Sequence, residues 1–191
     1  MPLQVAAVLL GLLAAGALWL EPERAHIVAL AVLALLWAWT STVYHIVHFA
    51  QINRAAIGLG VLFIVQAILF AVYAMQGRSL ELSPSAPGRV WAWALILYAL
   101  LLYPLLGIWS GHVYPAAPVF GVTPCPLVVC TFGMFLFSCQ RAPWTLFAIP
   151  ALWSVIGGVL ARRLPGRALP VITVIAVVVN GLKPRLTPCP A

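Results

Sequence analysis

Long uncharged stretches, separated by single charged residues or short charged clusters, organise this chain. Residues 1–20, 25–53, 55–77, 90–140 and 142–161 contain no Asp, Glu, Lys or Arg. About 20 apolar residues, rising roughly 1.5 Å each, cover the hydrocarbon core of a bilayer, so each stretch can cross a membrane and the 51-residue fourth stretch can cross twice. The pattern predicts spans at about 3–20, 27–50, 55–76, 90–110, 123–139, 143–162 and 167–182.

All of these segments are predicted to be helices, because an open sheet edge leaves backbone groups unsatisfied in lipid. The connections are short except for the polar segment 77–89, which leaves no room for a separate soluble domain. The expected fold is therefore all-α: a single polytopic membrane domain, residues 1–191, with about seven transmembrane helices. The seventh is the weakest prediction, because its uncharged part, 168–182, is only fifteen residues long.

Composition supports a membrane environment and argues against nucleic acid as a partner. The chain is 64% hydrophobic and 7% charged, whereas ordinary soluble domains are roughly 25% charged. The net charge of +7 comes from basic residues at the ends of apolar blocks, where they anchor helices at lipid headgroups. The expected location is a cell inner membrane or plasma membrane, crossed several times. The distribution of Lys and Arg gives conflicting cues for orientation.

Single residues inside the apolar blocks have predicted structural roles. Gln66 is a lone polar residue in mid-helix and is expected to form an interhelical hydrogen bond. Pro104 and Pro150 are expected to kink their helices. Gly58 and Gly60 are expected to allow close helix contacts, as are Gly157 and Gly158.

The second predicted span carries a stripe of polar residues. Steps of three and four residues place five polar side chains along one face of an α-helix: Ser41, Tyr44, His45, His48 and Gln51. Polar groups within a membrane helix are costly unless they are paired or hydrated, so this face is expected to contact protein. The stripe indicates either a functional site or hydrogen bonding to a neighbouring helix.

Two histidines of this stripe are candidate metal ligands. His45 and His48 are three residues apart, so on an α-helix their side chains point about 60° apart and can converge on one transition-metal ion. Further ligands would be His112 and Cys125, which the span count places near the same membrane face. Tyr44, Arg54 and Tyr114 complete the set of candidate ligand-binding residues.

The segment 111–126 is uncharged but rich in turn-forming residues. Its prolines and glycines prevent one continuous helix, and Thr123 is predicted to N-cap the fifth span with Pro124 in its first turn. Cys125 would then lie at a helix N-terminus, which favours a thiolate. It is a candidate ligand or redox thiol; alternatively, the Pro-Cys-Pro sequence only sets the helix entry. Cys139 and Cys189 fall on the opposite side, where a disulfide would need an oxidising compartment.

Several short motifs carry a resemblance to a known family. They run from the second to the sixth predicted span: Tyr44-His45, Phe49-Ala50, Ile52-Asn53-Arg54-Ala55-Ala56, Tyr98 to Gly107, Gly111-His112-Val113-Tyr114-Pro115, Pro118-Val119-Phe120-Gly121, Pro124-Cys125-Pro126, Thr131-Phe132-Gly133, Ile149-Pro150-Ala151-Leu152-Trp153 and Ile156-Gly157-Gly158. With these residues the chain resembles a bacterial family of multi-span membrane proteins catalogued as domain of unknown function 6064. The resemblance implies a membrane bundle and no assigned activity.

Two functions from different classes are compatible with the sequence. One is a transporter-like or sensor-like protein that binds a metal ion or small ligand at the His/Cys pocket near one membrane face. The other is a non-catalytic accessory or assembly subunit whose polar stripe binds a membrane protein partner. An enzyme is less favoured, and no catalytic residue is predicted, because the chain has no Asp and its acids are Glu21, Glu23 and Glu81, all in predicted loops.

Overall fold

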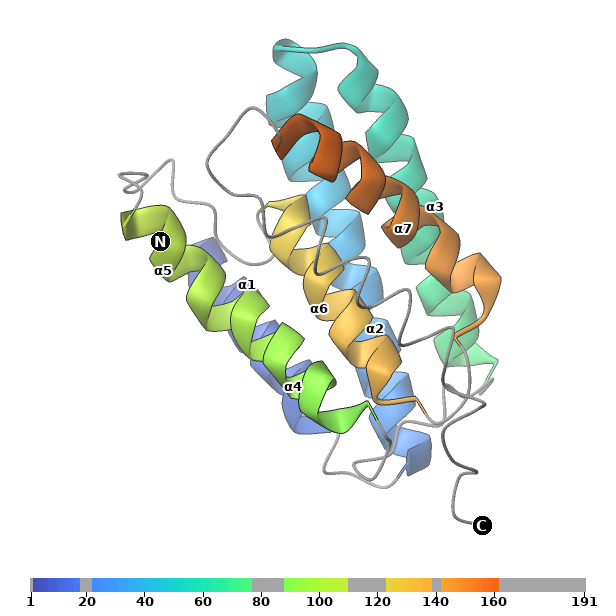
Figure 1. Ribbon diagram of the computed structural model, residues 1–191. Helices are drawn as coiled ribbons and strands as arrows, with labels where there is room; N and C mark the ends of the chain where they lie inside the picture. Colours follow the sequence, from blue (N-terminus) through green and yellow to red (C-terminus); the bar gives the residue numbers. More distant parts are fainter. Residues whose placement is uncertain (1, 18–21, 77–87, 110–122, 139–141, 162–191) are drawn as a thin grey trace.

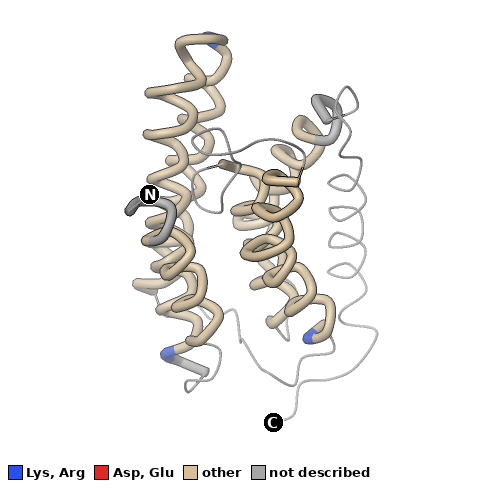
Figure 2. The backbone as a smooth tube through the Cα atoms, turned by 90° about the vertical axis from the view of Figure 1, so that its left-hand side faces the viewer, with Lys and Arg blue, Asp and Glu red and all other residues tan. Residues whose placement is uncertain are grey.

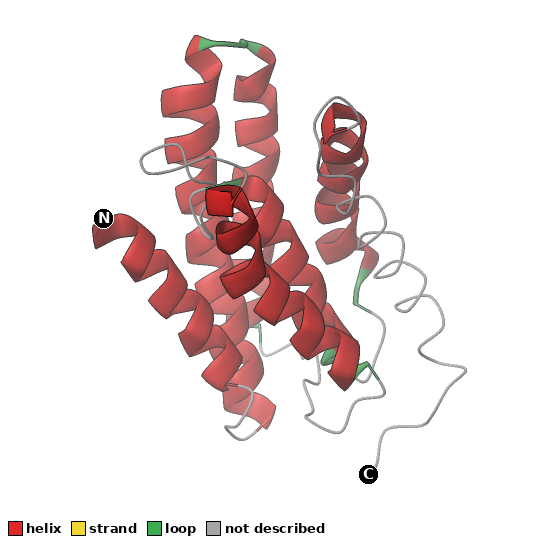
Figure 3. Ribbon diagram, turned by 60° about the vertical axis from the view of Figure 1, so that its left-hand side comes forward, coloured by secondary structure: helices red, strands yellow, loops and turns green. Residues whose placement is uncertain are grey.

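The computed structural model describes residues 2–17, 22–76, 88–109, 123–138 and 142–161, and this part of the chain is helical (Figures 1 and 3). The elements are α1 (Pro2–Gly16), α2 (Pro22–Trp39), η2 (Thr40–His48), η3 (Phe49–Gln51), α3 (Ala55–Met75), α4 (Arg89–Leu97), η4 (Tyr98–Leu102), α5 (Tyr103–Trp109), α6 (Pro124–Leu136) and α7 (Trp144–Ala161). The first six predicted segments are confirmed as helices. The seventh, 167–182, lies outside the described residues.

Three described helices are long and apolar enough to cross a membrane: Arg24–Gln51, Ala55–Met75 and Arg89–Trp109. Shorter apolar helices cover Ala6–Gly16, Pro124–Leu136 and Trp144–Gly157. Figure 2 shows basic residues of the described chain only at the ends of the helices. These are Arg24, Arg54 and Arg89, and all three are exposed.

Helix α6 forms the centre of the bundle. Every residue of α6 except Cys125 is buried, because the helix packs against α2, α4, η4 and α7 (Figure 1). Gly133 allows the closest of these approaches, since a Cβ there would lie 2.8 Å from Cγ1 of Ile96 and 3.1 Å from the Ala92 carbonyl oxygen. A helix that is apolar on nearly all sides suits such a central position, as it also suits a membrane span.

The outer faces of the helices carry large aliphatic side chains. Leu9, Leu35, Ile68, Leu105 and Val155 are each more than half exposed, and they come from α1, α2, α3, α5 and α7. A soluble monomer rarely exposes so much apolar surface. The outside of the described bundle is therefore suited to an apolar solvent.

Gln66 connects α3 to α7 by a hydrogen bond to the Leu146 carbonyl, which lacks its usual helical donor because of Pro150. Pro150 lies inside α7 and has no N–H to donate to the carbonyl of Leu146, four residues earlier. Gln66 is fully buried, and its Nε2 donates to that carbonyl oxygen at 3.0 Å. The predicted interhelical role of Gln66 is confirmed, and it repairs the gap that Pro150 leaves in α7.

Two segments, η2 and η4, widen into π-helical geometry. In η4, Pro104 removes the hydrogen bond that the Leu100 carbonyl would otherwise receive, which favours a wider turn just before the proline. In η2, side chains bond to the local backbone: the Thr42 hydroxyl shares its one proton between the carbonyl oxygens of Ala38 (3.1 Å) and Trp39 (3.0 Å). Such segments are rare and are found frequently at functional sites.

The predicted close contact at Gly60 is present, whereas that at Gly58 is absent. The Ser41 hydroxyl donates to the Gly60 carbonyl oxygen at 2.7 Å. A Cβ at Gly60 would lie 3.0 Å from Cγ1 of Ile46 and 3.3 Å from Cβ of His45. A Cβ at Gly58 would meet nothing within 4 Å. Gly60 therefore lets η2 and α3 approach each other beside His45.

Candidate functional site

The predicted polar stripe, which falls on η2 and η3, divides between the interior and the surface. Ser41 and His45 are fully buried and Tyr44 is half-buried, but His48 and Gln51 are exposed. A π-helix closes its ring over five residues, or roughly 4.4 residues per turn, so residues three apart point about 115° apart instead of about 60°. His45 and His48 therefore do not converge as the α-helical pattern predicted.

Three of the four predicted metal ligands, His45, His48 and Cys125, lie within the described residues. The described residues contain no group of three or more His, Cys, Asp or Glu side chains placed to hold one ion. The Nδ1–H of His48 donates to the Val43 carbonyl oxygen at 2.7 Å on the exposed side. His112 and Tyr114 lie outside the described residues, and Arg54 is exposed at the N-cap of α3.

Cys125 occupies the predicted helix N-terminus. Thr123 is the N-cap residue of α6 with an extended backbone, φ −106° and ψ 145°, and Pro124 follows in the first turn. Pro124 loses nothing there, because the first N–H groups of a helix have no intrahelical partner. Cys125 is the second residue of α6, and its side chain is partly buried.

Four side chains interact with the Cys125 thiol. The Tyr103 hydroxyl and the Trp153 indole N–H both face the sulfur at short range. The Tyr44 and Tyr98 hydroxyls lie close enough to interact with it electrostatically. We call these residues, together with His45, the Cys125 cluster: Tyr44, His45, Tyr98, Tyr103, Cys125 and Trp153. It draws on η2, η4, α5, α6 and α7, including both π-helical segments.

The His45 ring is enclosed by other aromatic rings. Its centroid is 4.4 Å from that of Phe63, 5.1 Å from that of Tyr44 and 5.2 Å from that of Trp153. Nδ1 lies 3.3 Å from the Thr40 carbonyl oxygen. Because a carbonyl only accepts, Nδ1 carries the proton, and Nε2 of the neutral ring is left as an acceptor.

Two ring nitrogens of the cluster are buried without a hydrogen-bond partner in the described structure. They are Nε2 of His45 and Nε1 of Trp153, which makes no hydrogen bond of ordinary geometry to the sulfur it faces. His45 is 0% exposed and Trp153 is 8% exposed. By contrast, the buried Trp37 donates from Nε1 to the Thr131 hydroxyl at 3.0 Å, and that hydroxyl donates to the Leu127 carbonyl oxygen at 2.9 Å.

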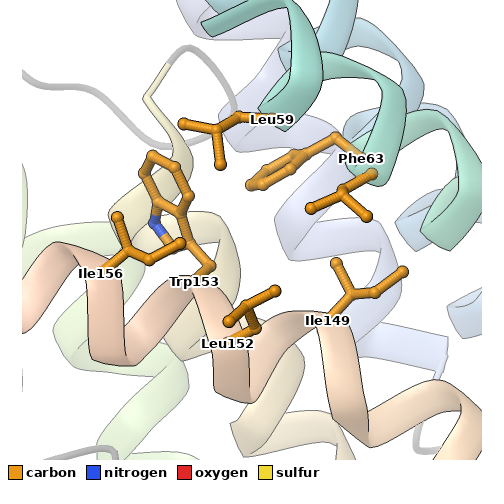
Figure 4. A pocket seen from close by; sticks show the side chains of 7 residues that line it. Leu59, Phe63, Ile149, Leu152, Trp153 and Ile156 are labelled. Atoms are coloured by element: carbon orange, nitrogen blue, oxygen red, sulfur yellow. The ribbon is translucent and has the colours of Figure 1, made fainter. Parts of the chain in front are cut away.

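A small apolar pocket, with free space of about 10 Å³ or roughly the room of one water molecule, adjoins the cluster between α3 and α7 (Figure 4). Its lining consists of Leu59, Leu62, Phe63, Ile149, Leu152, Trp153 and Ile156. Figure 4 shows the indole nitrogen of Trp153 on the ring edge that is turned away from Leu59 and Phe63. The Phe63 and Trp153 rings line this pocket and also contact the His45 ring, which is not part of the lining.

Of the Cys125 cluster, the sequence predicted Tyr44, His45 and Cys125 as candidate ligand-binding residues, but not Tyr98, Tyr103 and Trp153. These three aromatic residues fit the general pattern of packing and interfacial aromatics, so the sequence did not connect them with Cys125. One signal was available: Tyr103 directly precedes Pro104, where a widened helix was to be expected.

Comparison with known proteins yields a family without an assigned activity. A family model described as "Family of unknown function (DUF6064)" matches residues 1–187. The chain matches no curated protein and no solved structure.

Proposed function

The chain belongs to the DUF6064 family, and we propose that it is a multi-pass membrane protein that binds a small molecule at the Cys125 cluster. The ligand is mostly apolar and carries a hydrogen-bonding group such as a hydroxyl. It lies near the membrane face at which Arg54 is found. The observation that carries the proposal is the pair of buried, unpartnered ring nitrogens on His45 and Trp153, whose ring centroids are 5.2 Å apart.

Three features support a membrane location. Three helices have the length and apolar character needed to cross a bilayer, and the outer faces carry exposed aliphatic side chains. The described basic residues lie at helix ends (Figure 2). We propose that the shorter helices also cross and that the segment 167–182 is a seventh span, which together form a multi-pass protein of the inner or plasma membrane.

The unpartnered nitrogens define what the ligand must offer. Nε2 of His45 accepts a hydrogen bond and Nε1–H of Trp153 donates one. Leaving such a buried group unsatisfied costs about 1–3 kcal/mol, and both nitrogens are buried within the protein. A hydroxyl group can donate to one nitrogen and accept from the other, so its binding would remove both penalties.

A small molecule fits these residues better than a metal ion. Within the described chain, only His45 and Cys125 of the predicted metal ligands belong to the cluster, and protein metal sites usually supply three or four ligands. The cluster contains no Lys, Arg, Asp or Glu. A neutral ligand therefore meets no uncompensated charge.

The test is to identify what the protein carries after gentle purification. Wild type, Trp153→Phe and Trp93→Phe would be extracted with organic solvent, and small molecules would be quantified per protein by mass spectrometry. Trp93 packs against Phe137 and has no contact with the Cys125 cluster among the described interactions, so it is the matched Trp→Phe control. Losing one hydrogen bond worth about 1–3 kcal/mol weakens binding roughly 5- to 150-fold.

The expected result is one molecule at near-stoichiometric amounts in wild type and Trp93→Phe and at least a fivefold loss in Trp153→Phe. Equal amounts in all three proteins, or no molecule above the detergent background, would overturn the proposal. A stably co-purifying protein that all three retain, with no small molecule, would instead support an accessory subunit.

A further inference from the structure

We infer that the ligand enters sideways from the bilayer, through the apolar pocket between α3 and α7, and is therefore a lipid-soluble molecule. This inference rests on the proposed function and adds a route and a ligand class to it. The pocket is lined only by apolar side chains and a tryptophan whose nitrogen points elsewhere (Figure 4). A charged or strongly polar solute gains no hydrogen bond from such a lining.

The mouth of the pocket faces the same surroundings as the outer faces of the helices. Leu152, in its lining, is 46% exposed. The neighbouring Val155 is 65% exposed, and Val61 on the facing helix is 55% exposed. If these side chains contact lipid, the pocket opens toward lipid and not toward water.

The two aromatic rings that line the pocket also contact the His45 ring. The Phe63 and Trp153 rings are 5.3 Å apart at 85° and line the pocket. The same two rings contact the His45 ring, at 4.4 Å and 5.2 Å. Moving either ring would join the pocket to the Cys125 cluster.

Gly157 leaves space beside one edge of the Trp153 indole. Gly157 lies one helical turn further along α7, and even an added Cβ there would be 3.8 Å from the indole Nε1. Because Gly157 has no side chain, only its backbone atoms lie next to the Nε1 edge of the Trp153 indole on this part of α7. In the inferred route, rotation of the Trp153 side chain connects the pocket to the cluster.

Thiol labelling of Cys125 measures access by each route. The protein in lipid vesicles would be treated with N-cyclohexylmaleimide, which is uncharged and lipid-soluble, or with a quaternary-ammonium methanethiosulfonate, which is permanently charged. Modified peptides would be quantified by mass spectrometry, so that Cys125 is read separately from the other cysteines. Cys130, which is 1% exposed on the same helix, is the internal control for unfolding.

Leu152→Trp fills the mouth of the pocket, and Leu13→Trp is the matched control on α1, where the leucine is 55% exposed. We expect the maleimide to label wild-type Cys125 at least tenfold faster than the charged reagent does. Leu152→Trp should slow the maleimide at least fivefold, whereas Leu13→Trp should change it less than twofold. If Leu152→Trp labels Cys130 and is therefore misfolded, Ile156→Phe, which narrows the same pocket, replaces it.

Two results would overturn the inference: faster labelling of wild-type Cys125 by the charged reagent, or maleimide labelling that a folded pocket-filling variant leaves unchanged. A different result would show that the proposed function is wrong: the pocket variants would still slow the labelling of Cys125, but no molecule would co-purify with the wild-type protein. If a molecule co-purifies and depends on Trp153 while the pocket variants label normally, the site stands and the lateral route is wrong.

Discussion

The hydrogen bond from Gln66 to the Leu146 carbonyl should stabilise the fold only because Pro150 leaves that carbonyl without its helical donor. In Gln66→Leu, the Leu146 carbonyl oxygen becomes a buried acceptor with neither a helical nor a side-chain donor, which costs about 1–3 kcal/mol. The substitution also removes Gln66 Oε1, which is buried without a partner in the described structure. That gain offsets part of the cost, so we expect a net destabilisation of about 1 kcal/mol.

Pro150→Ala should abolish this cost. Alanine restores a backbone N–H at position 150 that can donate to the Leu146 carbonyl, so the Gln66 amide is no longer needed there. In the Pro150→Ala background, Gln66→Leu should be neutral or slightly stabilising. The two substitutions should therefore couple by about 1–2 kcal/mol, well above the roughly 0.5 kcal/mol expected of independent sites.

Equilibrium unfolding in mixed detergent micelles, with increasing mole fractions of denaturing detergent, would measure the four free energies of unfolding. Tryptophan fluorescence is a suitable signal, because Trp37 is fully buried and packs 4.3 Å from Phe63 in the core. If Gln66→Leu lowers the free energy of unfolding by the same amount with proline or with alanine at position 150, then Gln66 does not act by replacing the hydrogen bond that Pro150 removes.

Three further predictions use the same unfolding assay. Trp37→Phe should lower the free energy of unfolding by about 1 kcal/mol, because it breaks the hydrogen bond to Thr131. Trp153→Phe in ligand-free protein should lower it clearly less, because Trp153 Nε1 has no partner to lose. Equal losses would mean that Trp153 Nε1 has a protein partner. Gly133→Ala should lower the free energy of unfolding by about 1–3 kcal/mol, because the added Cβ would clash with α4. Gly58→Ala, where the added Cβ meets open space, should change it by less than about 0.5 kcal/mol. A larger loss for Gly58→Ala than for Gly133→Ala would refute the close packing of α6. His48→Ala should change stability by less than about 0.5 kcal/mol and leave the co-purified molecule unchanged, because His48 is exposed; loss of the molecule would place His48 in the site.

The helices were predictable because charged residues divide the chain into uncharged blocks. Arg54 marks the turn between the second and third helices, and Arg89 begins the fourth. Prolines and glycines located the start of α6 at Pro124. Such signals are local, so they can be read without knowing which helices are neighbours. The number of spans is not fixed by them, because the shorter helices cross a bilayer only by thinning it or by extending beyond their apolar cores.

The site was only partly predictable, because it depends on how helices are rotated against one another. A stripe with α-helical spacing placed His45 and His48 together, but the π-helical turns of η2 separate them. Trp153 and Tyr103 come from α7 and α5, and nothing in the local sequence indicates that they face Cys125. The glycine at position 133 likewise shows its importance only through its contact with Ile96.

The most direct test of the ligand site is an experimental density map of the protein in lipid nanodiscs, at a resolution that shows side chains and bound molecules. We predict non-protein density beside the Cys125 cluster, with an atom about 3 Å from Nε1 of Trp153 or Nε2 of His45. A map in which both nitrogens are hydrogen-bonded to protein atoms, with no other density in the cluster, would contradict the account.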